Sequence, residues 1–253
     1  MPAATPPPMI QIVDLHKSFG SHHVLSGITL DVPAGSTLVI LGGSGSGKTV
    51  LMKHMIGLLK PDSGRVVVDG EDIVPLGPEG LERMRRKFGM VFQAAALFDS
   101  MTVFENVSFP LREHRKELSE DQIRALVKEK LGIVGLKNVE EKYPADLSGG
   151  MRKRVGLARA IVLDPKIVLY DEPTTGLDPI TTDYVDEMIL DAKKELGVTS
   201  VVISHDIASA FKVADNIAFL YQGNIVDQGH PSKLRHSEHP AVKLFLSTWF
   251  GKN

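Results

Sequence analysis

An α/β fold built on a mostly parallel sheet is the fold class that the sequence predicts. Short runs rich in β-branched residues recur along the 253 residues, and several of them are continuously apolar instead of alternating. Such runs are typical of strands that are buried on both faces of a parallel sheet. Segments with helical spacing lie between the runs, as an α/β layering requires. The expected strands are residues 10–15, 37–41, 66–68, 89–92, 167–170, 198–204 and 217–221.

The helical signal is concentrated in the middle of the chain. Ser119-Glu-Asp-Gln122 has the pattern of a capping box and precedes apolar residues at helical spacing. We therefore expect an α/β core with a β-rich N-terminal part, interrupted by a helical subdomain, within one domain of about residues 10–246. The expected segments are a flexible arm at 1–9, core at 10–98, the helical subdomain at 99–163, core again at 164–230 and a helical tail at 231–253.

The composition excludes several classes of protein. The chain has 29 Lys+Arg and 31 Asp+Glu, a net charge of −2, and therefore lacks the basic footprint of a nucleic-acid-binding protein. The absence of cysteine excludes disulfides and thiolate metal sites. No apolar run approaches the ~20 residues of a membrane-spanning helix, and the first eight residues do not resemble a secretory signal. We expect a chain that stays in the cytoplasm and reaches a membrane only through a partner, with no nucleic-acid partner.

A glycine-rich loop follows the expected strand at 37–41. The residues Gly42-Gly-Ser-Gly-Ser-Gly-Lys-Thr49 match the P-loop pattern G-x-x-x-x-G-K-[ST], and a helical pattern follows at 50–59. Backbone amides of such a loop converge on phosphate oxygens, while the lysine bridges the β- and γ-phosphates and the threonine hydroxyl binds Mg²⁺. The sequence therefore predicts a P-loop NTPase core that binds ATP and Mg²⁺. The ATP-binding residues are expected to be Gly42, Gly43, Ser44, Gly45, Ser46, Gly47, Lys48 and Thr49.

Two adjacent carboxylates end the expected strand at 167–170. Asp171 at the strand tip is suited to hold Mg²⁺ together with Thr49. Glu172 points the other way and is suited to polarise a water for attack on the γ-phosphate. Beside a P-loop, this pair predicts a nucleotide hydrolase.

A third motif carries a family resemblance. Leu147-Ser-Gly-Gly-Met151, followed by Arg-Lys-Arg-Val-Gly-Leu-Ala-Arg-Ala160, resembles the signature motif of ATP-binding cassette (ABC) ATPases, and the resemblance extends from residue 10 to about 229. Ser148 is suited to cap a helix whose first amides, at Gly149 and Gly150, form a second anion site. Most members have glutamine where Met151 stands, so one side-chain contact is lost while the backbone donors remain. The resemblance implies a homodimer in which ATP lies between the P-loop of one chain and the signature of the other.

Four further positions match functional residues of that family. Phe19 matches the aromatic residue that stacks on the adenine, and Gln93 matches the glutamine that contacts Mg²⁺ or the attacking water. Asp178 matches the loop at the dimer seam, and His205 matches the histidine that contacts the γ-phosphate. The resemblance thus implies that Glu172, His205 and Gln93 are catalytic, and that Thr49, Gln93 and Asp171 hold Mg²⁺.

Three stretches, 147–155, 92–98 and 178–183, narrow the resemblance to the ATPases of Mla-type phospholipid-transport systems of Gram-negative bacteria. This similarity implies an integral-membrane permease, a STAS-domain subunit and a periplasmic lipid-binding protein of the mammalian-cell-entry (MCE) type as partners. It also implies a peripheral place on the cytoplasmic face of the inner membrane. Cassettes for other cargo share parts of these stretches, so another importer or exporter, or a cassette that signals across the membrane, stays an alternative.

The C-terminal tail has an apolar stripe. Val242, Phe245, Leu246 and Trp249 recur at helical spacing. Two interpretations are open, since the stripe can pack on its own domain or dock on a second ATPase subunit or a partner.

Overall fold

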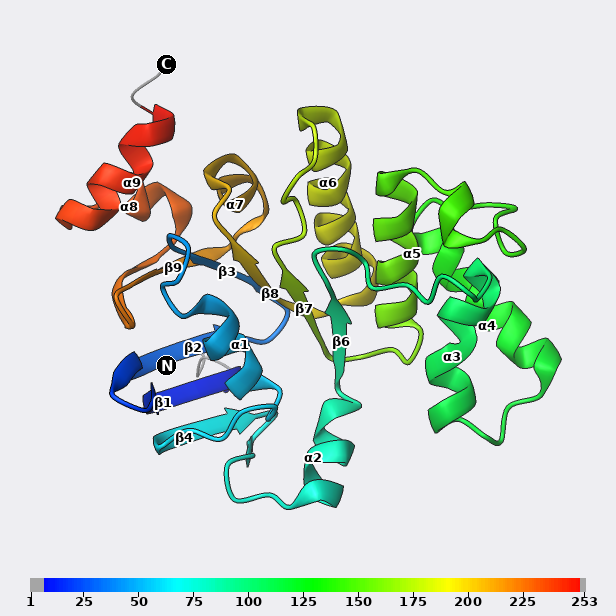
Figure 1. The fold of residues 1–253 in the computed structure, drawn as a ribbon, viewed down its shortest axis with the longest axis horizontal. Helices are drawn as coiled ribbons and strands as arrows, with labels where there is room; N and C mark the ends of the chain where they lie inside the picture. Colours follow the sequence, from blue (N-terminus) through cyan, green and yellow to red (C-terminus); the bar gives the residue numbers. More distant parts are fainter. Residues whose placement is uncertain (1–6, 251–253) are drawn as a thin grey trace, which may run out of the picture. The chain divides into compact units, whose positions relative to one another are not determined.

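The computed structural model (Figure 1) describes residues 7–250, with the exception of the Phe250 side chain. The chain divides into two compact units. Unit 1 comprises the described residues up to Arg85 and those from Thr199 onward. Unit 2 comprises Arg86–Val198 and is thus larger than the helical subdomain expected at 99–163, because two strands and a long helix cluster with the helices. Residues 1–6 of the expected arm and 251–253 of the tail lie outside the described residues.

Unit 1 begins with an antiparallel sheet, which is the β-rich N-terminal part. Its strands, in the order β2-β1-β4-β5, are β1 (Pro8–Phe19), β2 (His22–Pro33), β4 (Ser63–Val68) and β5 (Glu71–Asp72). The sheet already includes Pro8, so the arm is shorter than expected. The strand β2 was not among the expected strands, because its buried residues alternate with exposed ones instead of forming a continuous run.

Unit 1 also contains four strands of a second sheet, and several of them are continuous apolar runs. These strands, in the order β10-β9-β3-β8, are β3 (Thr37–Leu41), β8 (Thr199–Ser204), β9 (Asn216–Tyr221) and β10 (Asn224–Gly229). The strand β3 pairs in parallel with both β8 and β9, and all five of its residues are buried. This confirms the predicted parallel sheet. The helices of this unit before the tail are α1 (Lys48–Met55), α2 (Pro78–Arg85) and α7 (Ile207–Val213).

Unit 2 combines two parallel strands with a group of helices, drawn in green in Figure 1. Its elements are β6 (Phe88–Val91), β7 (Ile167–Asp171), α3 (Val103–His114), α4 (Glu120–Ile133), the 3-10 helix η1 (Pro144–Asp146), α5 (Gly149–Ile161) and α6 (Pro179–Leu196). The helices α3, α4 and α5 contact one another, and α5 also contacts β6 and α6. The predicted capping box at Ser119 is present at the start of α4, and Thr102 forms another at the start of α3. The mixed α/β class is therefore confirmed.

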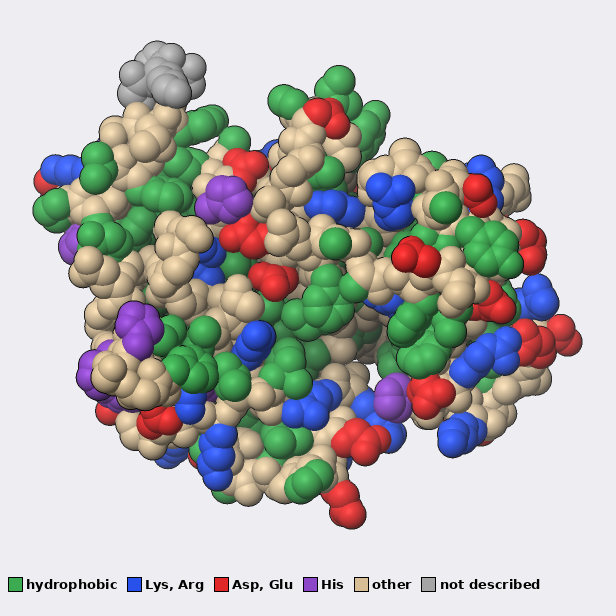
Figure 2. Space-filling view, in the orientation of Figure 1, with side chains coloured by type: hydrophobic (Ala, Val, Ile, Leu, Met, Phe, Trp, Pro, Cys, Tyr) green, Lys and Arg blue, Asp and Glu red, His purple; other side chains and the backbone are tan. Residues whose placement is uncertain are grey.

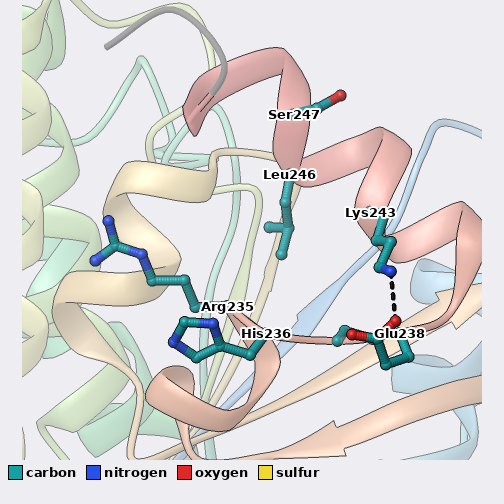
Figure 3. Close-up of a pocket in the computed structure, with 7 residues that line it drawn as sticks. Arg235, His236, Glu238, Lys243, Leu246 and Ser247 are labelled. Atoms are coloured by element: carbon teal, nitrogen blue, oxygen red, sulfur yellow. Dashed lines mark hydrogen bonds and ion pairs between the residues drawn. The ribbon is translucent and has the colours of Figure 1, made fainter.

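The tail folds as α8 (Pro231–Leu234) and α9 (Pro240–Phe250), and α9 packs on its own unit. Val242 and Leu246 are buried, and the Phe245 ring meets Phe219 of β9 edge-on at 5.1 Å. Figure 3 shows the hollow between residues 235–238 and α9, with Leu246 pointing toward it. Lys243 Nζ pairs with Glu238 Oε2 at 2.5 Å beside it. The first interpretation of the stripe thus holds for these three residues, and docking on a second subunit stays a prediction.

The surface mixes charges of both signs. Figure 2 shows Lys and Arg side chains interspersed with Asp and Glu side chains over the visible face. Within residues 7–250, none of the helices is both long enough and apolar enough to span a membrane.

Candidate nucleotide site

The loop Gly42–Thr49 connects the buried strand β3 to α1. The N-cap of α1 is Gly47, whose φ of 105° and ψ of 4° are a backbone conformation that residues with a side chain rarely adopt. Since a glycine N-cap supplies no side chain to the first helical amides, these amides remain donors for an anion at the helix N-terminus. The strand–loop–helix context that a P-loop requires is therefore present.

Lys48 lies across the inside of this loop. Its side chain is only 7% exposed, and Nζ donates to the carbonyl oxygens of Gly42 at 2.9 Å and Gly43 at 3.0 Å. These bonds hold the ammonium beside the amides that would surround a phosphate. The loop thus presents a positive charge together with backbone donors, which is the chemistry of a phosphate site.

The parallel register in unit 1 brings His205 to the same sheet edge as the loop. Leu41 of β3 pairs with Ser204 of β8, so Gly42 and His205 leave neighbouring strands side by side. Ligands of open α/β sheets bind at the carboxyl ends of the strands. Phe19 ends β1 in the other sheet, and its ring is 49% exposed, with Lys17 Nζ 5.5 Å from the ring centre.

The same logic places Gln93 beside the two carboxylates in unit 2. Val91 of β6 pairs with Tyr170 of β7, so the turn containing Gln93 and the pair Asp171-Glu172 follow neighbouring parallel strands. Glu172 has a φ of 51°, and its Oε2 accepts a hydrogen bond from Thr175 Oγ1 at 2.9 Å. A non-glycine residue with positive φ is strained, and such residues are concentrated at functional sites.

Lys153 supports this turn from the middle of α5, a contact that the sequence did not predict. Its buried ammonium donates to the carbonyl oxygen of Pro173, the residue after Glu172. Burial lowers the pKa of Lys153 below its ordinary value. Lys153 is the fifth residue of α5, but the carbonyl lies 20 positions away, so no local pattern reveals the bond.

The signature residues and Asp178 line one cavity of about 430 Å³ in unit 2. Its walls are formed by Ser148, Gly149, Gly150, Arg154, Gly176, Leu177, Asp178, Thr181, Tyr184 and Val185. The Ser148 hydroxyl caps α5 by accepting from the Met151 amide at 3.3 Å, a bond that does not involve the Met151 side chain. The helix N-terminus and the Arg154 guanidinium both favour an anion here. Arg154 and Tyr184 are wall residues that the motif alone did not indicate.

Asp178 is the N-cap of α6. Its Oδ1 accepts from the amides of Ile180 at 3.0 Å and Thr181 at 3.1 Å, and its Oδ2 accepts from Thr181 Oγ1 at 2.6 Å. These hydrogen bonds, that of the Thr181 hydroxyl first, hold the pKa of Asp178 below its ordinary value. Asp178 therefore fixes the wall of the cavity as a charged N-cap.

The residues expected to hold Mg²⁺ fit this ion chemically. Thr49, Gln93 and Asp171 offer hydroxyl, amide and carboxylate oxygens, the ligands that Mg²⁺ prefers, and Mg²⁺ takes few protein carboxylates because phosphates and waters complete its shell. In the part of the chain that the structure describes, no three His, Asp or Glu side chains converge as a metal cage. Hydroxyl, amide and carboxylate oxygens are the donors that a Mg²⁺ site completed by phosphates would use.

Similar sequences include proteins named as ATP-binding proteins of transport systems. The chain is 45% identical to the "Probable ribonucleotide transport ATP-binding protein mkl" of Mycobacterium leprae, over 94% of this chain and 68% of that protein. It is 41% identical to "Protein TRIGALACTOSYLDIACYLGLYCEROL 3, chloroplastic" of Arabidopsis thaliana, over 94% of this chain and 73% of that protein. It is 38% identical to the "Intermembrane phospholipid transport system ATP-binding protein MlaF" of Escherichia coli, over 94% of this chain and 88% of that protein.

Solved structures share the fold. CbiO1 of Clostridium perfringens, part of the ABC transporter complex CbiONQ, superposes with a TM-score of 0.86 at 31% identity, over 97% of both chains. The ATP-binding cassette MJ0796, in a dimeric post-hydrolysis state bound to ADP and Pi, gives a TM-score of 0.79 at 31% identity, over 88% of this chain and 99% of that one. The family model for "ABC transporter" matches residues 25–175. The chain therefore belongs to the ABC transporter family and is an ATP-binding cassette ATPase.

Proposed function

We propose that this ATPase drives phospholipid transport between the inner and outer membranes and thereby maintains the lipid asymmetry of the outer membrane. The observation that carries the proposal is the extent of the similarity to MlaF, which spans 94% of this chain and 88% of that protein. The chain spans only 66–68% of the Mkl proteins, so a third of their length has no counterpart here. A match along nearly the whole length of both chains supports a shared role better than a shared cassette does.

In the proposed cycle, Lys48 and the amides of the P-loop bind the ATP phosphates, and Phe19 stacks on the adenine. Thr49, Asp171 and Gln93 would hold Mg²⁺, which neutralises charge on the phosphates when bound. Glu172 accepts a proton from the attacking water, and His205 donates a hydrogen bond to the γ-phosphate.

A second copy of the chain completes each site in this proposal. Ser148, Gly149 and Gly150 of the partner bind the γ-phosphate through the N-terminus of α5 and the Ser148 hydroxyl. The cavity beside these residues and the anion-attracting Arg154 support this assignment. The dimeric state of MJ0796 supports the homodimer. ATP binding then closes the dimer, and hydrolysis reopens it.

The remaining partners follow from the same proposal. The ATPase lies on the cytoplasmic face of the inner membrane of a Gram-negative bacterium, and it is bound to an integral-membrane permease through the surface around residues 93–105. A STAS-domain subunit and a periplasmic MCE-type protein complete the system. The exposed Phe92, Phe98 and Phe109 side chains support a contact with an apolar partner segment.

A nucleotide cargo is the second candidate, because the higher identity of 45% is to proteins described as probable ribonucleotide transporters. The two cargoes differ in the surface they need, since a phospholipid requires an apolar path and a nucleotide a polar one. A direct transport measurement therefore separates them.

The test is to purify the complete complex from membranes and reconstitute it in lipid vesicles. We expect co-purified phospholipid, and ATP-dependent transfer of a fluorescent phospholipid to acceptor vesicles. Glu172→Gln should abolish the transfer, whereas Glu141→Gln, which changes an exposed glutamate, should leave it intact. Uptake of labelled ribonucleotide without lipid transfer would replace the phospholipid proposal by the second candidate.

A further inference from the structure

Two adjacent alanines in the turn after β6 have a strained backbone. Ala95 has a φ of 61° and Ala96 a φ of 48°, values in the left-handed region that residues with a side chain avoid. The Ala95 amide closes the turn by donating to the Phe92 carbonyl at 2.9 Å. Gln93 is exposed and lies in this turn, two residues before Ala95, so the backbone of the turn sets the direction of its Cα–Cβ bond. Strain of this kind persists only where surrounding groups enforce it.

The enforcing group is Arg159, which comes from α5. Its Nη2 donates to the Ala95 carbonyl at 2.8 Å, and its Nη1 donates to the Ala96 carbonyl at 2.8 Å. The planar guanidinium presents its donors in a rigid fork, so two bonds to successive carbonyls fix the orientation of both peptide planes. Its Cζ lies 6.0 Å from the centre of the Phe98 ring, a cation–π contact farther along the same segment.

Two further contacts complete the support. Gly156 lies three residues before Arg159 on α5, and a side chain there would place Cβ 3.3 Å from Ala95 Cβ, so this glycine allows the helix to approach the turn. The buried Asn106 of α3 anchors the far end of the segment, because its Nδ2 donates to the carbonyls of Phe98 and Met101 at 3.1 Å. The turn is therefore held by side chains from two helices.

The helix that carries Arg159 also carries the signature residues at its N-terminus. Gly149 and Arg159 are ten residues apart, about 15 Å along one helix at 1.5 Å per residue. We infer that Arg159 is a positioning residue that couples the signature helix to Gln93. When the partner's ATP shifts the N-terminus of α5, the Arg159 fork moves the Ala95-Ala96 turn and with it Gln93. This inference rests on the proposed function in two respects, because Gln93 must act in hydrolysis and the N-terminus of α5 must bind the partner's ATP.

The central test is Arg159→Lys in the full chain. The lysine keeps the positive charge but cannot donate to both carbonyls with a planar guanidinium. Steady-state ATP hydrolysis should show kcat lower by about tenfold and KM for ATP within twofold, since the P-loop residues are unchanged. The control Arg112→Lys alters an exposed arginine of α3 that makes two bonds to Glu120, and should leave both constants unchanged. A rise in KM with an unchanged kcat would overturn the inference.

Rescue separates positioning from a general loss of structure. Ala96 is exposed, and glycine adopts its φ without strain, so adding Ala96→Gly to Arg159→Lys should restore kcat to within twofold or threefold of wild type. Thermal unfolding of both variants, measured beside kcat, shows whether the rescue follows overall stability or the geometry of the turn alone. If the double variant stays as slow as Arg159→Lys, strain at Ala96 is not what Arg159 controls, and the inference is wrong.

A second variant reaches the same turn with Arg159 intact. Gly156→Ala improves helix propensity but crowds Ala95, so kcat should fall by about threefold without loss of thermal stability. If both Arg159→Lys and Gly156→Ala keep kcat within twofold of wild type, the inference fails.

Gln93→Ala separates the proposed role of Gln93 in hydrolysis from the coupling through Arg159. We expect it to lower kcat, and we expect Arg159→Lys to add less than a twofold effect in that background, because Arg159 acts through Gln93. An unchanged kcat in Gln93→Ala refutes the proposed role of Gln93 and the inference with it. A lowered kcat with a full additional effect of Arg159→Lys refutes the inference alone.

Discussion

The P-loop and the two turns that follow β6 and β7 place functional side chains in different ways. In the P-loop the positive φ at the helix start falls on a glycine, Gly47, and the long side chain that crosses the loop, Lys48, bonds carbonyls only five and six residues away. In the turns, positive φ falls on Ala95, Ala96 and Glu172. Each non-glycine residue in this conformation costs about 1–2 kcal/mol.

The turns are supported from a distance. Lys153 reaches the Pro173 carbonyl across 20 positions, and Arg159 reaches the Ala95 and Ala96 carbonyls across 64 and 63 positions. Both side chains come from α5, the helix that begins with the signature residues. The two Lys48 bonds in the P-loop are thus local in sequence, whereas the turns after β6 and β7 are held by bonds from a distant helix. Substitutions in the two regions should therefore separate ATP binding from turnover.

Lys48→Ala should give the largest effect and should affect binding and turnover together. Removing the only side-chain charge inside the loop eliminates a charge-assisted contact to the phosphates, so we expect ATP affinity to fall about 100-fold and hydrolysis at least as much. Equilibrium ATP binding and steady-state hydrolysis measure the two quantities. Lys53→Ala, which changes an exposed lysine of the same helix, is the matched control. An affinity within threefold of wild type would contradict the binding role of Lys48.

Glu172→Gln should affect turnover alone. The amide is isosteric but is a poor proton acceptor, so hydrolysis should fall about 100-fold while ATP affinity stays within a few-fold. The ATP-bound dimer should accumulate, because the closed dimer does not reopen without hydrolysis. Size-exclusion chromatography detects it. If Glu172→Gln hydrolyses ATP at a near-normal rate, Glu172 is not the base, and the contrast between the two regions loses its main support.

The features that the sequence predicted are those that depend on residues close together in the chain. Contiguous patterns gave the parallel strands β3 and β7, the P-loop, the carboxylate pair and the capping box at Ser119, because each depends on neighbouring residues. Strand β2 was missed because its burial alternates, a weaker signal than a continuous run.

The support of the turns after β6 and β7 could not be predicted from the sequence, for a physical reason. Lys153 and Arg159 look like solvated charges on a helix, and their partners are backbone carbonyls, which every residue type presents. The left-handed conformation of Ala95 and Ala96 is equally hidden, since alanine gives no sign of positive φ. Their geometry results from tertiary packing of α5 against β6, which only the fold reveals.

Lys153→Met tests whether the turn that contains Glu172 depends on a side chain from α5. Methionine fills the space but cannot donate, so the buried Pro173 carbonyl loses its bond, at a cost of about 1–3 kcal/mol in unfolding free energy. Because the bond lies next to Glu172, we expect kcat to fall by about tenfold with an unchanged KM. Lys128→Met, at an exposed position of α4, is the control. A loss of stability with an unchanged kcat would make Lys153 a purely structural residue.

The smallest effect concerns the helix after the P-loop and its stability toward acid. His54 of α1 is 1% exposed, its Nδ1 donates to the Val50 carbonyl at 2.7 Å, and its Nε2 has no hydrogen-bond partner among the described residues. Burial lowers the pKa of His54 below its ordinary 6.5, and the nearby Lys17 acts in the same direction, while the bond to Val50 and the charge of Asp62 oppose it.

The sign of the resulting pH dependence follows from this shift. As pH falls below about 6.5, the unfolded chain takes up a proton on His54 that the folded chain does not, so unfolding is favoured by at most about 1.4 kcal/mol per pH unit. The loss begins near pH 6.5 and continues down to the folded pKa, whereas above pH 6.5 this histidine contributes no pH dependence. Urea unfolding at pH 7.5, 6.5 and 5.5 should show a smaller decrease for His54→Gln than for wild type, while His236→Gln, at an exposed site of the tail, should follow wild type. If the unfolding free energy depends on pH equally in all three proteins, His54 accepts a proton as readily in the folded chain as in the unfolded one. Burial of a neutral His54 would then not affect the acid stability of α1.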